Sequence, residues 1–448
     1  MKKMLRSISN RASRLCEWSE SIPAMRHGDC YVAAFPAALA PHASAGATNP
    51  FLFLGRVVFW ISVILLTLLA TANPAGAQSG SVVSDVRVVS EFGKRVTFLA
   101  RIQSPLGVQS ATVTFREEGG IQQTQPLTLS PDGTAGYTYD ASVKALKPFA
   151  RIVFWFTVTL ADGTQAQSEN YNFDYVDNRF PWQAREDGVL RIHWVEGDAS
   201  FGDAVLDVTR RGLQSVSTLI TVDLTEPIDI WVYPTAEELQ GALLLGGQSW
   251  VAGHASPELG VVMVSVAPGA DQSIQLERQA PHELAHVLLY RRVGPNYDRL
   301  PVWLREGMAS MAELYPDPDY DTVLKEYAGT NSLIPLTDLC DSFPPDTASA
   351  YLAYAESKSF TQYIVDNYGT SGLTSLALAY ADGLDCEQGA RQALGPSLSQ
   401  LETRWRESAL GENRGGVILS NLLPYLILLI LLLAAPVTVA LGRIARRK

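Results

Sequence analysis

Apolar and polar residues alternate in short runs between residues 81 and 177, which is the pattern of strands with one buried face. Val, Thr, Tyr and Phe dominate these runs, and Asp132-Gly133 and Asp162-Gly163 mark tight turns between them. Roughly a hundred residues of short strands and regular turns predict a small β-sandwich, in which no residue pattern indicates chemistry. The expected strands are Val86–Val89, Arg95–Ile102, Ala111–Phe115, Gly136–Asp140 and Arg151–Leu160.

The pattern changes across a predicted junction at residues 178–187. From residue 188 to 412, strand-like runs and helix-like spacing are mixed, which predicts an α+β domain. Proline is favoured in the first turn of a helix, so Pro281 predicts a helix that begins near Ala280 or kinks there, and Pro301 predicts the start of another. Further strands are expected at Val189–Val195, Ile228–Tyr233 and Gly260–Val266, and helices at Ala204–Leu219 and at Ala348–Tyr368, where Gly369 forms the cap.

Two segments are continuously apolar. Residues 57–72 precede Ala75-Gly76-Ala77, an order typical of a secretory signal and its cleavage site. The residues before this segment reflect either a start codon assigned too early or a long cytoplasmic region. Residues 417–441 are long enough to span a bilayer, which needs about twenty apolar residues, and the basic residues after them indicate a cytoplasmic end.

These segments predict a single-pass protein of the cell membrane with its ectodomain outside and its C-terminus in the cytoplasm. The predicted parts are an N-terminal extension with signal peptide (1–77), a β-sandwich (81–177), a catalytic domain (188–412), a transmembrane helix (417–441) and a basic cytoplasmic tail (442–448).

Composition narrows the class of protein. The chain of 448 residues is 47% hydrophobic and 18% charged, with a formal net charge of −11. No basic stripe exists to replace the counterions of a nucleic acid, so nucleic acid is not an expected partner. None of the four cysteines forms a C-x-x-C pair, which argues against a thiolate metal site. Cys340 and Cys386 are the two cysteines of the predicted outside portion, and we expect them to form a disulfide.

The strongest chemical signal is His282-Glu283-Leu284-Ala285-His286, an H-E-x-x-H motif. Residues four apart lie on one face of a helix, so His282 and His286 can grip one Zn²⁺ ion from that face. Glu283 is then placed beside a water molecule rather than on the metal. Two histidines on a solvated helix face would give the same letters, but the apolar residues that follow the motif argue against that interpretation.

Twenty residues after His286 stands Glu306, within Trp303-Leu304-Arg305-Glu306-Gly307. Together, the two motifs resemble the gluzincin (MA clan) zinc metallopeptidases, specifically the peptidase MA-like domain family. The resemblance implies that His282, His286 and Glu306 bind zinc and that Glu283 is the catalytic base. The expected fold is multidomain: an N-terminal immunoglobulin-like β-sandwich, an α+β zincin-type metallopeptidase domain and a C-terminal transmembrane helix.

The implied activity is hydrolysis of a peptide or protein substrate. Zinc activates water, Glu283 transfers its proton to the leaving amine, and a hydrogen-bond donor steadies the oxyanion. Gluzincins often supply that donor from a downstream Tyr, for which Tyr354 is the candidate and Tyr351 the second choice. In that family a strand such as Gly260–Val266 forms the edge along which substrate lies, although the same residues also suit an interior strand.

Some features of the family are missing. No G-x-M-E-N stretch is present, which favours an endopeptidase or a specialised peptidase, and Ser310 stands where thermolysin-like enzymes carry an acidic residue. A membrane-anchored binding or sensor protein on a zincin scaffold is the alternative function, against which Glu283 argues. Hydrolysis of a non-peptide amide also stays open. His193 and His254 are expected to be structural.

Overall fold

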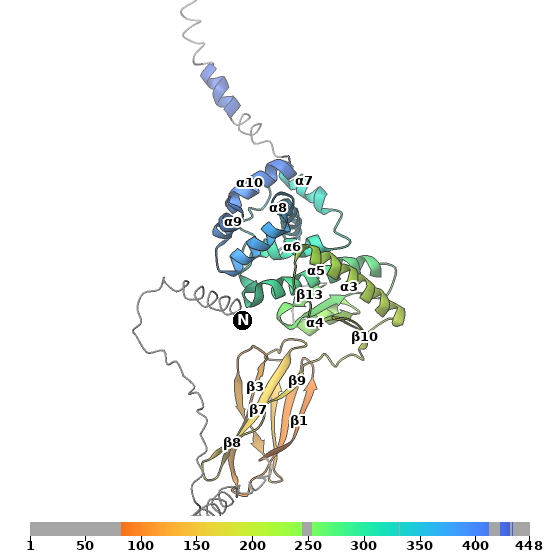
Figure 1. Cartoon of the computed structure of the whole chain (residues 1–448), viewed down its shortest axis with the longest axis vertical. Coiled ribbons are helices and arrows are strands. Elements are labelled where there is room, and N and C mark those ends of the chain that lie inside the picture. The colour runs from red at the N-terminus through yellow and green to blue at the C-terminus, as the bar shows by residue number, and fades with distance from the viewer. Residues whose placement is uncertain (1–81, 244–252, 331, 412–421, 431, 433–448) are drawn as a thin grey trace, which may run out of the picture. The chain divides into compact units, whose positions relative to one another are not determined.

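The computed structural model describes residues 82–243, 253–330, 332–411, 422–430 and 432 (Figure 1). The predicted signal segment, the N-terminal extension and the basic tail lie outside these residues, as does most of the predicted transmembrane segment. Of that segment, residues 422–430 and 432 are helical, and their side chains are exposed. Within the described ranges, no helix combines the length and the apolar character needed to cross a membrane.

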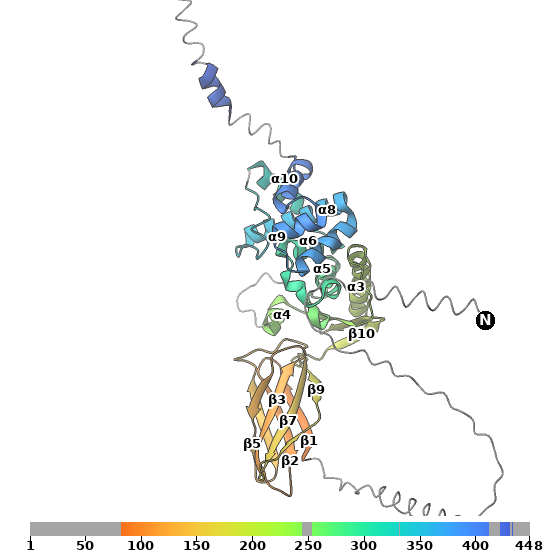
Figure 2. The same ribbon diagram turned by 60° about the vertical axis from the view of Figure 1, so that its left-hand side comes forward.

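Residues 83–174 form two antiparallel sheets (Figure 2). The sheets enclose an aromatic core. One sheet has the order β1-β2-β6-β5. The other has the order β4-β3-β7-β8, and β9 also pairs with β7. Phe98, Phe115 and Phe154 lie between the sheets, with ring centroids 5.0–5.1 Å apart for the pairs that include Phe98. The strands are β1 (Val83–Glu91), β2 (Arg95–Ile102), β3 (Val108–Glu117), β4 (Gln123–Pro126), β5 (Thr128–Leu129), β6 (Thr134–Asp140), β7 (Arg151–Leu160), β8 (Gln165–Gln167) and β9 (Tyr171–Asp174).

A third sheet, with five strands, has the order β10-β11-β12-β14-β13. Its three inner strands run parallel, and each edge strand is antiparallel to its neighbour. The strands are β10 (Gln183–Asp187), β11 (Leu190–Trp194), β12 (Ile228–Tyr233), β13 (Gly253–Ser256) and β14 (Val261–Ser265). The strand predicted at Gly260–Val266 is an interior strand of this sheet, and β13 is the edge strand beside it. The predicted junction at residues 178–187 contains a strand, β10.

Both faces of β12 and β14 are largely buried, because apolar residues alternate onto both sides, whereas β11 buries one face and carries Arg191 and His193 on the other. On β12, Ile228, Ile230 and Val232 join a core with helices α3 (Ala199–Leu219) and α5 (Gln272–Val293). Trp231 and Tyr233 point to the opposite face and join the core of the sandwich. The sandwich and the third sheet therefore share one apolar cluster at this face, which also includes Val261 and Met263.

The segment between the sandwich and β10 is fixed by the buried Asp177 side chain. Its carboxylate accepts hydrogen bonds from the Arg179 guanidinium at 2.6 and 2.8 Å and from the Tyr233 hydroxyl at 3.0 Å. The Trp182 indole donates to the Asp177 carbonyl at 2.7 Å. These bonds tie the connection to β12 of the third sheet.

The C-terminal part of the chain is mostly helical. The helix predicted to end at Gly369 does so: Gly369 has a φ of 70° and interrupts α8 (Thr347–Ala381). At the start of α4 (Ala236–Leu243), the Glu238 amide donates to the Thr235 hydroxyl at 3.2 Å. The remaining helices are α6 (Val302–Ala312), α7 (Tyr320–Gly329), α9 (Cys386–Leu394) and α10 (Leu398–Ala409), with 3-10 turns at η1 (Pro257–Leu259) and η2 (Gly294–Arg299).

Candidate metal centre

Helices α5 and α6 bring the motif residues together. His282 and His286 lie on α5, and Glu306 lies on α6, which packs against it. One ligand atom from each of the three residues lies within 4.8 Å of the other two. Glu306 Oε2 is 3.3 Å from His282 Nε2 and 3.8 Å from His286 Nε2. Among the described residues, this is the one group of three or more His, Cys, Asp or Glu side chains arranged closely enough to hold a metal ion.

Helix α5 begins earlier than the sequence predicted. It starts at Gln272 and runs through Pro281, so the prediction of a start near Ala280 is wrong. Pro281 has no amide hydrogen and leaves the carbonyl of Glu277 without its helical donor. The Leu314 amide donates to that carbonyl instead, at 2.9 Å. The helix therefore tolerates the proline because the freed carbonyl has a partner just beyond the end of α6.

That contact places Glu313 beside the first histidine. Glu313 is the residue that follows the last turn of α6, and its Oε1 lies 3.0 Å from His282 Nδ1. Its side chain is almost fully buried. The thermolysin-like pattern places an acidic residue at position 310, where this chain has Ser310, buried in α6. The sequence does carry a signal for Glu313, because it lies seven positions, close to two helical turns, after Glu306 and so shares its face.

The second histidine has a different partner. His286 Nδ1 lies 2.8 Å from the hydroxyl of Tyr297, which is buried in the η2 turn between α5 and α6. With each Nδ1 engaged, the Nε2 atoms of both imidazoles face Glu306. A hydrogen bond at one ring nitrogen fixes which nitrogen is left for a metal.

Burial and charge set the protonation of the site. Burial lowers the pKa of His286 to about 4, which leaves its imidazole neutral. Burial raises the pKa of Glu283 to about 7, with the negative charges of Glu306 and Glu313 acting in the same direction against the charge of His282. At His282, burial is outweighed by hydrogen bonds with Glu306 and Glu313, which hold its pKa well above the usual range.

These residues fit a zinc ion. Two imidazoles and one carboxylate are zinc donors, and three protein donors leave a position open for water or substrate. Two carboxylates flank His282 and attract positive charge, which a divalent cation would supply. The hydrogen-bonded Nδ1 atoms add the outer support that metal-binding histidines commonly have.

Glu283 points toward the edge of the sheet. Its carboxylate lies so close to Gly253 of β13 that a Cβ atom at that position would be 2.5 Å from Glu283 Oε1. The Glu283 residue is 8% exposed. The edge strand, the carboxylate and the three candidate ligands therefore border one site.

Tyr354 lies closer to the site than Tyr351. The ring of Tyr354, on α8, is 6.3 Å from that of His282 and packs edge-on against Phe343. Burial raises its pKa, and the negative charges of Glu306 and Glu283 raise it further, so the phenol keeps its proton. Tyr351 packs against Tyr320, and its pKa is raised by burial and by Asp317.

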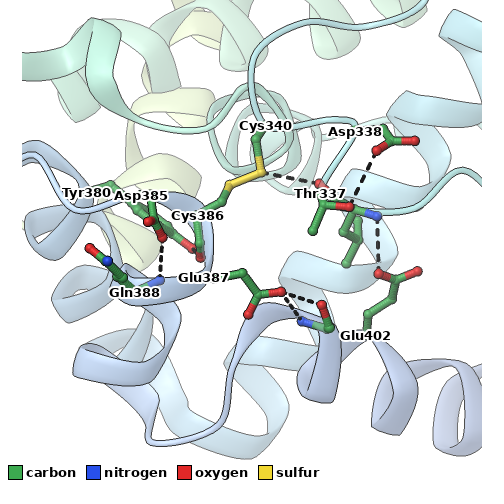
Figure 3. The surroundings of a disulfide bond; sticks show 11 residues. Thr337, Asp338, Cys340, Tyr380, Asp385, Cys386, Glu387, Gln388 and Glu402 are labelled. Carbon is green, nitrogen blue, oxygen red and sulfur yellow. Dashed lines mark hydrogen bonds between the residues drawn. A yellow bond between two sulfur atoms is a disulfide. The ribbon is translucent and has the colours of Figure 1, made fainter.

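The predicted disulfide between Cys340 and Cys386 is confirmed (Figure 3). It joins the segment before α8 to the start of α9, with the Cα atoms 6.5 Å apart. The carbonyl of Cys340 accepts the Val302 amide at 2.9 Å, and that of Leu339 accepts the Trp303 amide at 3.1 Å. The bridged segment thus caps the helix that carries Glu306.

The other two described histidines lie outside the ligand group. His193, on β11, has its Nε2 2.9 Å from Asp229 Oδ1 and stacks on Trp231 with ring centroids 3.8 Å apart. His254, on the edge strand β13, has its pKa lowered by burial.

Comparison with known protein families finds one match. Residues 208–411 match the sequence model of the Peptidase MA superfamily. No curated protein matches the chain. An M1 zinc metallopeptidase from Deinococcus radiodurans, solved as a mutant, is 14% identical, with coverage of 71% of this chain and 92% of its own and a TM-score of 0.35.

A carbohydrate-binding module of family 56, a β-1,3-glucan-binding domain, is 16% identical over 20% of this chain and 94% of its own, with a TM-score of 0.15. The resemblance seen in the two sequence motifs is supported by the family match, which contains all three candidate ligands and Glu283. The part of the chain that carries the site, residues 208–411, is a peptidase MA-like domain.

Proposed function

We propose that this protein is a membrane-anchored, extracytoplasmic zinc metallopeptidase that hydrolyses peptide bonds. The observation that carries the proposal is the convergence of His282, His286 and Glu306 within 4.8 Å, with the Glu283 carboxylate buried at the same site. The family match supports a peptidase. When bound, zinc lowers the pKa of water to about 7 and polarises the substrate carbonyl.

Glu283 is the general base of the proposed reaction. Its pKa of about 7 lies near neutral pH, where a carboxyl group can both accept and return a proton. It takes the proton of the attacking water and delivers it to the leaving amine. The backbone of the neighbouring edge strand packs closely against this carboxylate, since a Cβ atom at Gly253 would lie 2.5 Å from Glu283 Oε1.

Tyr354 is the proposed donor to the oxyanion. Its raised pKa keeps the hydroxyl protonated and able to donate. The ring lies beside His282, whereas Tyr351 packs on Tyr320. The position of Tyr354 therefore favours it over Tyr351 for this role.

The substrate backbone is proposed to pair with the open edge of β13. Within the described residues this strand pairs with β14 alone, so the amides and carbonyls on its other side can extend the sheet by one peptide strand. Glu283 packs against the same strand at Gly253. A peptide bound there would pass the proposed base.

The proposed location rests on the sequence. The signal-like segment 57–77 and the apolar segment 417–441 with its basic tail support an ectodomain outside the cell membrane. The disulfide between Cys340 and Cys386 agrees with an oxidising compartment.

The decisive experiment separates the base from the ligands. Glu283→Gln in the purified full-length chain should keep wild-type zinc, while peptide hydrolysis falls by about 10³–10⁴-fold, because one group serves both proton transfers. His282→Ala should lose zinc and activity together, because it leaves only two protein ligands. Zinc is measured by elemental analysis, and hydrolysis with a peptide library read by mass spectrometry.

The same experiment tests the alternative, a binding or sensor protein on a zincin scaffold. If Glu283→Gln hydrolyses peptides as fast as the wild type, the proposed mechanism is refuted. A wild-type chain that binds zinc and cleaves no peptide would favour the binding protein. If His282→Ala and the wild type bind equal amounts of zinc, His282 is not a ligand and the metal site lies elsewhere.

A further inference from the structure

The η2 turn, Gly294–Arg299, carries a tyrosine that contacts the metal centre. Tyr297 is 8% exposed, and its ring stands edge-on to that of His286, at 88° and with the centroids 6.4 Å apart. Its hydroxyl lies 2.8 Å from His286 Nδ1. A neutral imidazole with its proton on Nδ1 donates to the phenol oxygen and keeps the lone pair of Nε2 for a metal.

The two histidines differ in their outer partners: the Glu313 carboxylate faces His282, and the Tyr297 hydroxyl faces His286. An uncharged acceptor orients the ring without adding another negative charge to the site.

Arg305 also packs against the tyrosine. Its guanidinium lies 5.1 Å from the centre of the Tyr297 ring, and it pairs with Asp298 at 3.5 Å. Arg305 directly precedes Glu306 on α6. Tyr297 thus connects the helix of the second histidine to the helix that carries the carboxylate ligand.

We propose that Tyr297 is a positioning residue that fixes the ring of His286 and so sets the zinc affinity of the site. The inference rests on the proposed zinc centre and extends it to a residue that the H-E-x-x-H motif does not contain. Tyr297 acts through His286 and Arg305, and touches neither the metal nor the substrate.

The test compares zinc affinity in full-length variants by competition with a chelator. Tyr297→Phe removes only the hydroxyl and should weaken zinc binding by about 10–100-fold, the usual effect of losing an outer partner of a metal-binding histidine. Tyr290→Phe is the matched control: Tyr290 is a neighbour at 6.1 Å between ring centroids, and its hydroxyl makes no hydrogen bond within the described part of the chain. It should bind zinc like the wild type.

Two further measurements separate positioning from loss of folding. The visible spectrum of the Co²⁺-substituted protein should shift in Tyr297→Phe and not in Tyr290→Phe, because the His286 ring is free to turn only in the former. Tyr297→Gln keeps an acceptor and should recover part of the affinity. Melting of the metal-free proteins shows whether each variant folds.

Equal zinc affinity and equal Co²⁺ spectra in Tyr297→Phe and the wild type would overturn the inference. A fall in affinity that matches a general loss of folding, with no recovery in Tyr297→Gln, would overturn it as well. A wild-type chain that binds zinc but cleaves no peptide refutes the proposed peptidase function alone, since the zinc comparison does not depend on hydrolysis.

Discussion

Gly253→Ala tests where the proposed base lies. The backbone of Gly253 has no left-handed φ, so alanine is compatible with its conformation. The added Cβ would instead meet Glu283, at 2.5 Å from Oε1 and 3.1 Å from Cδ. Contacts of a Cβ atom under 3.0 Å are essentially never found, so the carboxylate or the edge strand must move.

The size of the effect follows from that contact. Lengthening 2.5 Å to at least 3.0 Å requires a displacement of about half an ångström, and an ordinary contact of 3.4 Å requires nearly one. A misplacement of about 1 Å in a reacting group can cost about 10²-fold in rate. We therefore expect the kcat for peptide hydrolysis to fall by about 10- to 100-fold.

Zinc content should be unchanged in Gly253→Ala, since none of the candidate ligands is touched. Gly269→Ala is the matched control, because nothing lies within 4 Å of a Cβ at Gly269. The assay measures kcat and bound zinc for both variants with one peptide substrate. If Gly253→Ala turns over like Gly269→Ala, Glu283 does not occupy this position during catalysis, and the assignment of the base to this geometry fails.

Three further results are expected. Glu313→Gln should weaken zinc binding by about 10–100-fold in a chelator competition, because it replaces the charged partner of His282. Unchanged zinc affinity would show that Glu313 does not support the metal centre. Burial raises the pKa of the Glu356 carboxyl to about 8. The protonated carboxyl therefore stabilises the folded chain fully below about pH 4.5, and this stabilisation is lost as the pH rises toward 8. Glu356→Gln should therefore gain roughly 3–5 kcal/mol in the free energy of unfolding relative to wild type between pH 4.5 and 8.5, measured with urea, and a pH-independent difference would contradict this. Reduction of the Cys340–Cys386 disulfide should lower the free energy of unfolding by roughly 4 kcal/mol, given the sequence separation of 46 residues. An unchanged denaturant midpoint after reduction would contradict this stabilisation.

Helices and strands were predicted best from the sequence where a single local pattern determined their bounds. The bounds of β2, β7 and β12 agree with the runs of alternating residues, and the helix end at Gly369 follows from a residue suited to a left-handed φ. The order and spacing of His282, His286 and Glu306 also indicated that these side chains converge, as they do.

The errors came from interactions between distant segments. Pro281 lies within α5 because the Glu277 carbonyl binds the Leu314 amide, a contact that no local rule about proline contains. Residues 183–187 form the strand β10 because β11 offers them an open edge. Tyr297 stands in a connecting turn without a pattern, and only the packing of α5 on α6 brings its hydroxyl to His286.

The apolar cluster shared by the sandwich and the third sheet limits how the chain can be shortened. Removing residues 82–177 would expose Trp231, Tyr233, Val261 and Met263 to water and leave Tyr233 without its bond to Asp177. A fragment that starts at β10 should therefore aggregate, because an exposed apolar patch invites self-association. The smallest piece suited to expression and crystallisation begins near residue 82, ahead of every residue that contacts the metal centre.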